Sequence, residues 1–422
     1  MVRNIMLHED EYIQANENLV FLPYKENDFV VYNPSKYSYA KLSPNAFKIV
    51  LYARIPQTVD TLWSLFPEAK EEDKKGFIDT ISKLTDDGFL HLHNEIPNRP
   101  VLNKLEVPSC PARVVVHLTY RCNLNCRYCY NKGVREVKQS ELSYDEWAVV
   151  FDEIRRSEIT SVVITGGEPF LRRDIFPLIK QLKMYGKRIT IGTNGTLITK
   201  EDIDFLRDSV DEVNLSIDSY LDTEHDFNRG EGSHAKCVEA AHLLTSSEIS
   251  WKAQMTYNFT NYKSHAETVE FVKKLGATNL AITVDTSSDD AHMHMSEYMH
   301  PKHWIISEAG KKEPLELNIT CPGGYTVCAL DPQGYIYPCH MLMDRQFRGL
   351  SLVDHQLADA WLHSKCLAEI RSFDLMSVAE CRNCEFVGLC NGGCRGVAYT
   401  NSGCIHGFVG QEHCSLLRWT VF

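Results

Sequence analysis

The chain has no long apolar run and no excess of positive charge. No stretch of about 18 consecutive apolar residues occurs, so we do not expect a membrane-spanning helix. The first residues include Glu9, Asp10 and Glu11 and lack the apolar core of a secretory signal, so we expect a cytoplasmic protein. With 44 Lys and Arg against 56 Asp and Glu, the net charge of −12 excludes a molecule built as a whole to coat nucleic acid.

Cysteine, by contrast, is abundant. Fifteen Cys occur among 422 residues, and most of them gather at 122–129, 321–339 and 381–414. Without an export signal, this clustering favours metal or iron–sulfur ligation over disulfides, although it leaves both open. At roughly 100–200 residues per domain, the length predicts two to four domains.

Residues 1–95 have the pattern of a small α+β unit. Phe29–Tyr32 is predicted as a strand, Pro44 begins a helix, and two further helices at 58–66 and 70–86 precede a strand at 89–92. This order is typical of a winged helix-turn-helix. Residues 96–112 contain four prolines and are predicted to form a linker.

Residues 113–285, within a domain predicted to span 113–310, alternate between short apolar runs and helical stretches. This alternation is typical of parallel βαβ units and predicts an α/β fold. Ser143 and Glu146 form a capping box at the start of one helix. The predicted strands are 114–118, 161–165, 188–192, 212–217, 251–257 and 280–284.

The first cysteine cluster directly follows the first of these strands. Cys122, Cys126 and Cys129 can hold three irons of a [4Fe–4S] cluster, which leaves the fourth iron open for a ligand. The alternative is a structural zinc site, but zinc takes four ligands, and the nearby His117 lies inside the predicted strand. The CxxxCxxC spacing resembles the radical S-adenosylmethionine (SAM) family. The resemblance implies a partial (β/α)6 barrel and SAM on the open iron, with the aromatic Tyr128 before the last Cys as part of the pattern.

Further motifs follow at the ends of successive predicted strands. Gly166, Gly167 and Glu168 resemble the family's GGE motif, which contacts the SAM amine. Residues at the positions of Asn194, Ser216 and Asp218 contact the SAM carboxylate and ribose in the family. Ligands sit at the carboxyl ends of parallel strands, so the four motifs together are a stronger signal than any one of them.

Residues 311–422 resemble the SPASM domain, a C-terminal extension of peptide-modifying radical SAM enzymes that carries two auxiliary [4Fe–4S] clusters. The resemblance implies three clusters in the whole chain. It assigns one auxiliary cluster to Cys321, Cys328, Cys339 and Cys394, and the other to Cys381, Cys384, Cys390 and Cys414. Cys404 is the alternative to Cys414, and a zinc ribbon is the alternative to the whole array.

The N-terminal unit is not built to bind DNA. Residues 1–100 carry 11 Lys and Arg against 15 Asp and Glu, a net charge of −4, whereas phosphate binding needs a basic face. The order of its predicted elements resembles the peptide-recognition element of ribosomal peptide pathways, which adds a leader-peptide strand to a sheet edge. We expect Asp28–Tyr32 to be that edge region. The alternative is a structural cap on the barrel.

The resemblances together imply a radical SAM/SPASM enzyme that modifies a ribosomally made precursor peptide with a leader. A C–C or thioether crosslink is the expected product, and a flavodoxin- or ferredoxin-type protein is the expected one-electron reductant. Three alternatives stay open: an anaerobic sulfatase maturase, a peptide epimerase or decarboxylase, and a non-catalytic iron–sulfur or zinc scaffold. The first family has an Asp directly after the Cys that matches Cys339, where this chain has His340.

Overall fold

In the computed structural model, the chain forms two compact units. The first comprises Met1–Leu105, Ala309–Thr320 and Ala379–Gly392, and the second comprises the remaining residues. Described residues are 11–16, 19–24, 28–33, 38–53, 56–66, 69–95, 107–135, 140–285, 321–382, 384, 392–411 and 414.

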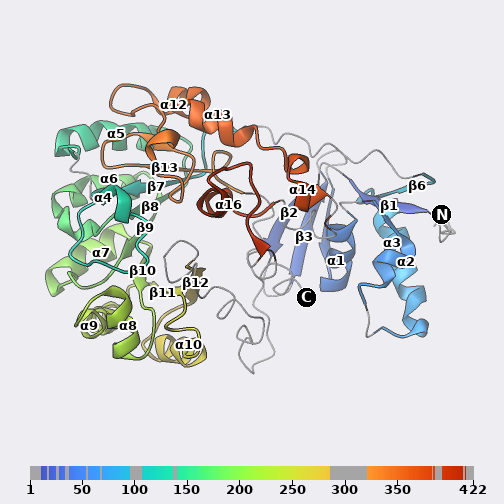
Figure 1. Ribbon diagram of the computed structural model, residues 1–422, viewed down its shortest axis with the longest axis horizontal. Coiled ribbons are helices and arrows are strands. Elements are labelled where there is room, and N and C mark those ends of the chain that lie inside the picture. Colours follow the sequence, from blue (N-terminus) through green and yellow to red (C-terminus); the bar gives the residue numbers. More distant parts are fainter. Residues whose placement is uncertain are drawn as a thin grey trace. The chain divides into compact units, whose positions relative to one another are not determined.

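The first unit is α+β, and its described residues between 11 and 95 form two small sheets and helices α1, α2 and α3 (Figure 1). One sheet has the order β5-β1-β6, from β1 (Tyr12–Ala15), β5 (Gln57–Thr58) and β6 (Leu90–His93). The other has the order β2-β3-β4, from β2 (Val20–Tyr24), β3 (Asp28–Asn33) and β4 (Ser38–Leu42). The helices are α1 (Pro44–Tyr52), α2 (Val59–Trp63) and α3 (Lys74–Asp86).

The expectation that Asp28–Tyr32 is an edge is wrong. Strand β3 pairs antiparallel with β2 on one side and with β4 on the other, so its backbone groups are already bonded on both sides. An added peptide strand needs free backbone donors and acceptors, and in this sheet β2 and β4 are the outer strands.

The second unit is built on one sheet of eight strands with the order β12-β11-β10-β9-β8-β7-β13-β14. All six strands predicted between residues 113 and 285 are present and pair in parallel. They are β7 (Arg113–His117), β8 (Ser161–Thr165), β9 (Arg188–Thr193), β10 (Glu212–Ser216), β11 (Trp251–Tyr257) and β12 (Leu280–Val284).

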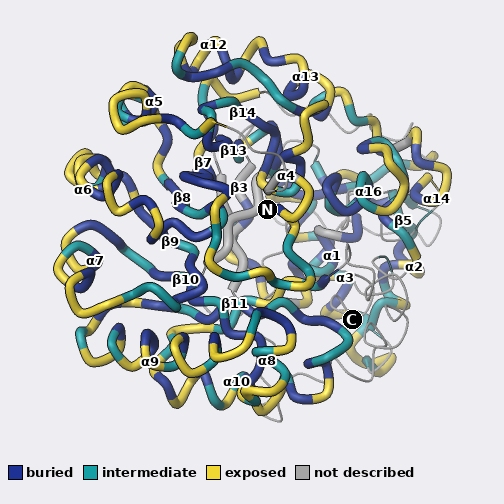
Figure 2. The backbone as a smooth tube through the Cα atoms, turned by 60° about the vertical axis from the view of Figure 1, so that its left-hand side comes forward, coloured by how far each residue is buried: buried dark blue, intermediate teal, exposed yellow. Residues whose placement is uncertain are grey.

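Helices connect these strands and pack around the sheet (Figure 1). They are α4 (Lys132–Arg135), α5 (Tyr144–Arg156), α6 (Phe176–Met184), α7 (Ile203–Ser209), α8 (Asp222–Arg229), α9 (Ser233–Ser246) and α10 (His265–Lys274). The predicted capping box of Ser143 and Glu146 is present at α5. Figure 2 shows strands β7 to β11 as buried or partly buried and the outer helices as alternately buried and exposed, so the core lies between the sheet and its helices.

The cysteine-rich segment contributes strands to the same sheet. Strand β13 (Val327–Leu330) runs parallel to β7, and β14 (Ile336–Tyr337) pairs antiparallel with β13. The segment also forms α12 (Leu357–His363), α13 (Lys365–Arg371), α14 (Ala379–Arg382) and α16 (Arg395–Ser402). Pairing of apolar strands therefore stabilises part of the cysteine-rich segment, although the weak periodicity of its sequence did not predict these strands. Within the described residues, no helix has the length and apolar character needed to cross a membrane.

Candidate active site

The three predicted cluster ligands lie on the loop that leaves the carboxyl end of β7. Cys122, Cys126 and Cys129 form no disulfide within the described residues, and all three are partly buried. The backbone N–H of Leu124 donates to the Cys122 Sγ at 3.4 Å, and Asn194 Nδ2 donates to the same sulfur at 3.8 Å. Burial, above all, raises the pKa of Cys126 to about 11. The Arg229 charge acts against this rise, and Asp218 and the thiols of Cys129 and Cys122 add to it. Donors aimed at a sulfur suit a thiolate that binds iron.

Gly166 and Gly167 hold the backbone that leads into this loop. A Cβ on Gly166 would lie 2.3 Å from the Thr119 carbonyl oxygen, and one on Gly167 would lie 2.1 Å from the Arg121 carbonyl oxygen. The N–H of Gly167 donates to Thr119 at 2.6 Å. The two glycines are therefore required for the close approach of the segment just before Cys122, in addition to any contact with a ligand.

Glu168 is fully buried beneath the same loop. Its carboxylate accepts hydrogen bonds from the N–H of Phe170 at 3.1 Å, the hydroxyl of Thr193 at 2.8 Å and the N–H of Asn194 at 2.9 Å. Burial raises the pKa of Glu168 to about 7, against which these three bonds act. A carboxylate has about four acceptor sites, so about one remains for the predicted SAM ammonium.

Asp218 is fully buried, and its carboxylate is hydrogen-bonded to other residues of the chain. It accepts two hydrogen bonds from Arg229, both at 2.9 Å, one from the N–H of Thr256 at 3.0 Å and one from the Tyr128 hydroxyl. Four bonds use the acceptor capacity of a carboxylate. Asp218 therefore fixes Tyr128, inside the cysteine loop, to strand β10 and helix α8, and its predicted contact with SAM stays a prediction.

Asn194 and Ser216 end strands next to the cysteine loop. Asn194 also donates to the Asn123 side chain at 3.0 Å, and its own oxygen accepts from Thr196. Ser216 is half-buried, and its carbonyl accepts from the thiol of Cys237 at 3.2 Å. The structure therefore brings Asn194 to the cluster loop and leaves the Ser216 side chain partly accessible at the same edge of the sheet.

Sequence reasoning missed a group of rings beside the cysteine loop. His117, the last residue of β7, is fully buried, and neither ring nitrogen has a partner among the described residues. Tyr130 lies between His117 and His340, with ring centroids 6.1 Å from each. Burial lowers the pKa of His117 to about 3 and raises that of Tyr130, although 47% of the Tyr130 surface is exposed. No sequence motif indicates these residues. The only signal in the sequence is that Tyr130 follows Cys129 and His340 follows Cys339.

Three of the four cysteines predicted for one auxiliary cluster lie together in the second unit. A Cβ built on Gly323 would lie 3.6 Å from the Cys321 Sγ and 3.4 Å from the Cys339 Cβ. Cys394 begins α16, whose Gly396 packs against Met341, two residues after Cys339. Burial, then the neighbouring Cys321 and Cys394 thiols, raise the pKa of Cys339.

Cys328 is not part of this group. It lies in the middle of β13, is fully buried and packs in the core of the sheet. Ala329 pairs with Tyr337, and successive strand residues point to opposite faces, so Cys328 points away from the face of Tyr337. Burial, then the thiol of Cys110, raise the pKa of Cys328, and the Arg371 charge acts against this rise.

The cysteines predicted for the other auxiliary cluster are divided between the units. Cys381 and Cys384 belong to the first unit and share one turn, in which the Cys384 N–H donates to the Cys381 carbonyl at 3.1 Å. Cys414 belongs to the second unit and packs beside Val397 and Val409, whereas Cys404 is exposed. Cys390 lies outside the described residues.

The donor set suits iron–sulfur clusters. Among the described residues, no three Cys, His, Asp or Glu side chains converge as they would on a single metal ion. A [4Fe–4S] cluster instead binds each thiolate through a different iron. The loop of Cys122, Cys126 and Cys129 could hold one such cluster with an open iron, and Cys321, Cys339 and Cys394 could hold another.

Three known proteins are similar to this chain in sequence or in fold. AdoMet-dependent heme synthase from Methanosarcina barkeri is 25% identical over 337 residues, covering 71% of this chain and 95% of that protein. Mycofactocin maturase MftC from Mycolicibacterium smegmatis is 28% identical over 317 residues, covering 69% of this chain and 79% of MftC. The crystal structure of Streptococcus suis SuiB bound to precursor peptide SuiA has the same fold, with a TM-score of 0.58 and 17% identity over 95% of this chain and 99% of SuiB.

The family match covers the strands that frame the cysteine loop. Residues 116–272 match the radical SAM superfamily, from the end of β7 to helix α10. Residues 116–272, which include the loop of Cys122, Cys126 and Cys129, are therefore similar to the radical SAM superfamily, and this similarity supports an enzyme.

Proposed function

We propose that this enzyme modifies a ribosomally made precursor peptide and forms a C–C or thioether crosslink within it. The observation that carries the radical SAM part is the loop of three thiols at the carboxyl end of β7. The peptide part is supported by the fold, which matches SuiB over 95% of this chain, including the N-terminal unit. MftC, named a maturase, adds support from sequence.

The residues of the chain prepare the site before any chemistry occurs. Gly166 and Gly167 hold the entry to the loop, and Asp218 with Arg229 fixes Tyr128 within it. Cys122, Cys126 and Cys129 would hold a [4Fe–4S] cluster with SAM on its open iron, and together these groups supply hydrogen-atom abstraction. The peptide residue to be modified would lie beside the cysteine loop at the carboxyl ends of the strands, shielded from bulk water.

The remaining ligands and partners belong to the same proposal. Cys321, Cys339 and Cys394 would hold one auxiliary [4Fe–4S] cluster, and Cys381, Cys384, Cys390 and Cys414 the other, as a SPASM domain over 311–422. A crosslink removes two hydrogens from the peptide. One would leave as the abstracted hydrogen atom, and the other as a proton and one electron, which an auxiliary cluster can accept. A flavodoxin- or ferredoxin-type reductant would supply the electron for SAM, and the winged-helix unit of residues 1–95 would bind the leader.

The test has two readouts. The reconstituted protein, kept anaerobic with dithionite, should form 5′-deoxyadenosine from SAM. A short peptide encoded beside this gene, co-expressed with the protein, should then show a mass lower by two hydrogens in mass spectrometry. Cleavage of SAM without any change in peptide mass would leave epimerisation, and absence of SAM cleavage would contradict the enzyme assignment itself.

A further inference from the structure

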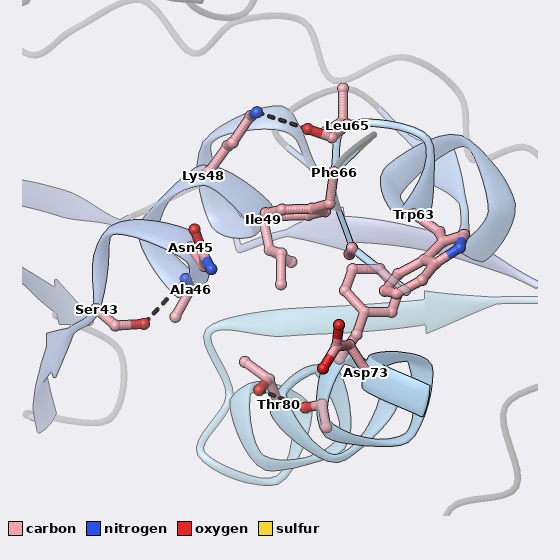
Figure 3. Close-up of a pocket in the computed structure, with 13 residues that line it drawn as sticks. Ser43, Asn45, Ala46, Lys48, Ile49, Trp63, Leu65, Phe66, Asp73 and Thr80 are labelled. Atoms are coloured by element: carbon pink, nitrogen blue, oxygen red, sulfur yellow. Dashed lines mark hydrogen bonds between the residues drawn. The ribbon is translucent and has the colours of Figure 1, made fainter. Parts of the chain in front are cut away.

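The first unit contains a pocket bounded by its three helical segments. Its volume is about 740 Å³, within the range of about 300–1,000 Å³ that is usual for ligand sites. Its wall is formed by α1, the turn after α2 and the first half of α3 (Figure 3). Among the described residues that line the pocket, none belongs to a strand, and Ser43 comes directly after β4. A ligand here would therefore be held by side chains rather than by strand addition.

Three aromatic rings form the apolar part of this pocket. The Phe77 ring centroid lies 5.1 Å from that of Trp63 and 5.8 Å from that of Phe66. Phe77 and Ile49 are buried, whereas Trp63 and Phe66 are partly accessible. Accessible ring surface around a hollow suits a bulky apolar side chain, since aromatic residues dominate the energy of such anchor sites.

Gly76 faces the same pocket from α3. A Cβ on Gly76 would meet nothing within 4 Å, and the residue is not among the glycines of positive φ. Glycine within a helix costs about 0.5–1 kcal/mol relative to alanine, and packing within the described residues does not require it. A larger side chain at this position would project into open space at the pocket wall, so the glycine leaves this part of the wall open.

Asp73 gives the pocket rim a negative charge. Its carboxylate accepts from the N–H of Lys70 at 2.9 Å, and no cation within the described residues forms an ion pair with it. Lys70 and Lys74 each pair with a glutamate. The Lys48 ammonium donates to the Leu65 carbonyl at 2.7 Å, at the other end of the pocket (Figure 3). The rim is therefore complementary to a cation at the Asp73 end, whereas the Lys48 ammonium, 5.1 Å from the Phe66 ring centroid, gives the other end a positive charge.

We propose that this pocket docks the precursor peptide outside its modified part. A bulky apolar side chain of the peptide enters between the Trp63, Phe66 and Phe77 rings, over Gly76, and a neighbouring lysine or arginine pairs with Asp73. The inference rests on the proposed function and adds to it a location and a recognition chemistry. It also replaces the edge-strand role that the central position of β3 rules out.

Binding is measured with the full-length protein. Fluorescein-labelled 12-residue peptides that tile the candidate precursor are titrated by fluorescence anisotropy. One peptide with a basic residue beside a bulky apolar residue should bind. Gly76→Leu should weaken that binding about tenfold or more because it fills the pocket. Asp73→Asn should weaken it about threefold, and more at low salt. Asp79→Asn, a matched change at an exposed position of α3 outside the pocket, should leave it unchanged.

Gly76→Ala separates binding from folding. Alanine favours the helix, so this variant should unfold at a higher temperature yet bind the peptide more weakly. If the wild type modifies the full precursor but the Gly76 and Asp73 variants bind as tightly as Asp79→Asn, the pocket is not the docking site. If sedimentation shows a dimer that Gly76→Leu dissociates, a second copy occupies the pocket and the proposal is overturned. If no peptide is bound or modified, the proposed function itself fails.

Discussion

The two groups of cysteines in the second unit are assembled in different ways. Cys122, Cys126 and Cys129 lie on one short loop, whose backbone is held by glycines and by a buried ion pair. Cys321, Cys339 and Cys394 come from three segments that lie far apart in the sequence. The first group depends on loop geometry, and the second depends on how strands and a helix bring distant segments together.

This difference determines which cluster ligands can be predicted from the spacing of cysteines in the sequence. Within a single loop, the spacing of cysteines nearly determines which thiols can share a cluster. Across separate segments, the direction of each side chain matters as much as its place in the order. Cys328 stands between Cys321 and Cys339 in the sequence, yet strand alternation turns it into the core of the sheet.

The largest effect is expected at the loop itself. Cys126→Ser should remove about four irons per chain, because a three-ligand site that loses one thiolate no longer holds its cluster. SAM cleavage should stop. The measurement is iron content together with 5′-deoxyadenosine formation, and Cys404→Ser, at an exposed cysteine, is the control. Equal loss in both variants would mean that iron retention does not distinguish the loop from other thiols.

The second prediction compares two cysteines of the distributed group. Cys339→Ser should lose an auxiliary cluster, about four irons. Cys328→Ser should keep its iron and lose about 1–3 kcal/mol of stability, because a hydroxyl would replace a thiol in the apolar core. Iron analysis and Mössbauer spectra of both variants measure the difference. Iron loss in Cys328→Ser equal to that in Cys339→Ser would restore the four-cysteine set.

The third prediction concerns the backbone under the loop. Gly167→Ala would place a Cβ 2.1 Å from the Arg121 carbonyl, which belongs to backbone and cannot turn aside. We expect a loss of more than about 3 kcal/mol in unfolding free energy, with poorer cluster incorporation. Gly133→Ala is the control, since nothing lies within 4 Å of its Cβ and alanine favours helix α4. Similar denaturant midpoints for the two variants would remove the structural role of Gly167.

Much of the fold follows from the sequence because its signals are local. Apolar runs bounded by helical stretches predicted all six parallel strands, and the limits of β8, β11 and β12 match the prediction to the residue. The capping box at α5 and Pro44 at the start of α1 are equally local.

The rest depends on contacts between segments distant in sequence. The central position of β3 is set by which strands pair, and the addition of β13 to the large sheet is set by tertiary packing. For the same reason the sequence indicated Asp218 as a SAM contact, whereas the structure shows its carboxylate engaged by Arg229, Thr256 and Tyr128. Composition cannot report how many acceptor sites of a buried carboxylate are already used.

The smallest effect is a pH dependence at Glu168, which links the loop to β9. Burial raises its pKa from 4.5 to about 7, so the folded protein holds this proton where the unfolded chain has lost it. The folded state therefore binds more protons between pH 4.5 and 7, and this contribution to stability is complete below pH 4.5 and is lost as pH rises through 7. The loss amounts to about 3 kcal/mol at most.

Glu168→Gln, which does not titrate, should flatten that part of the curve of unfolding free energy against pH, measured by urea denaturation. If the variant and the wild type gave parallel curves from pH 4.5 to 7, the three hydrogen bonds to Glu168 would outweigh its burial, and the carboxylate would be ionised beneath the loop.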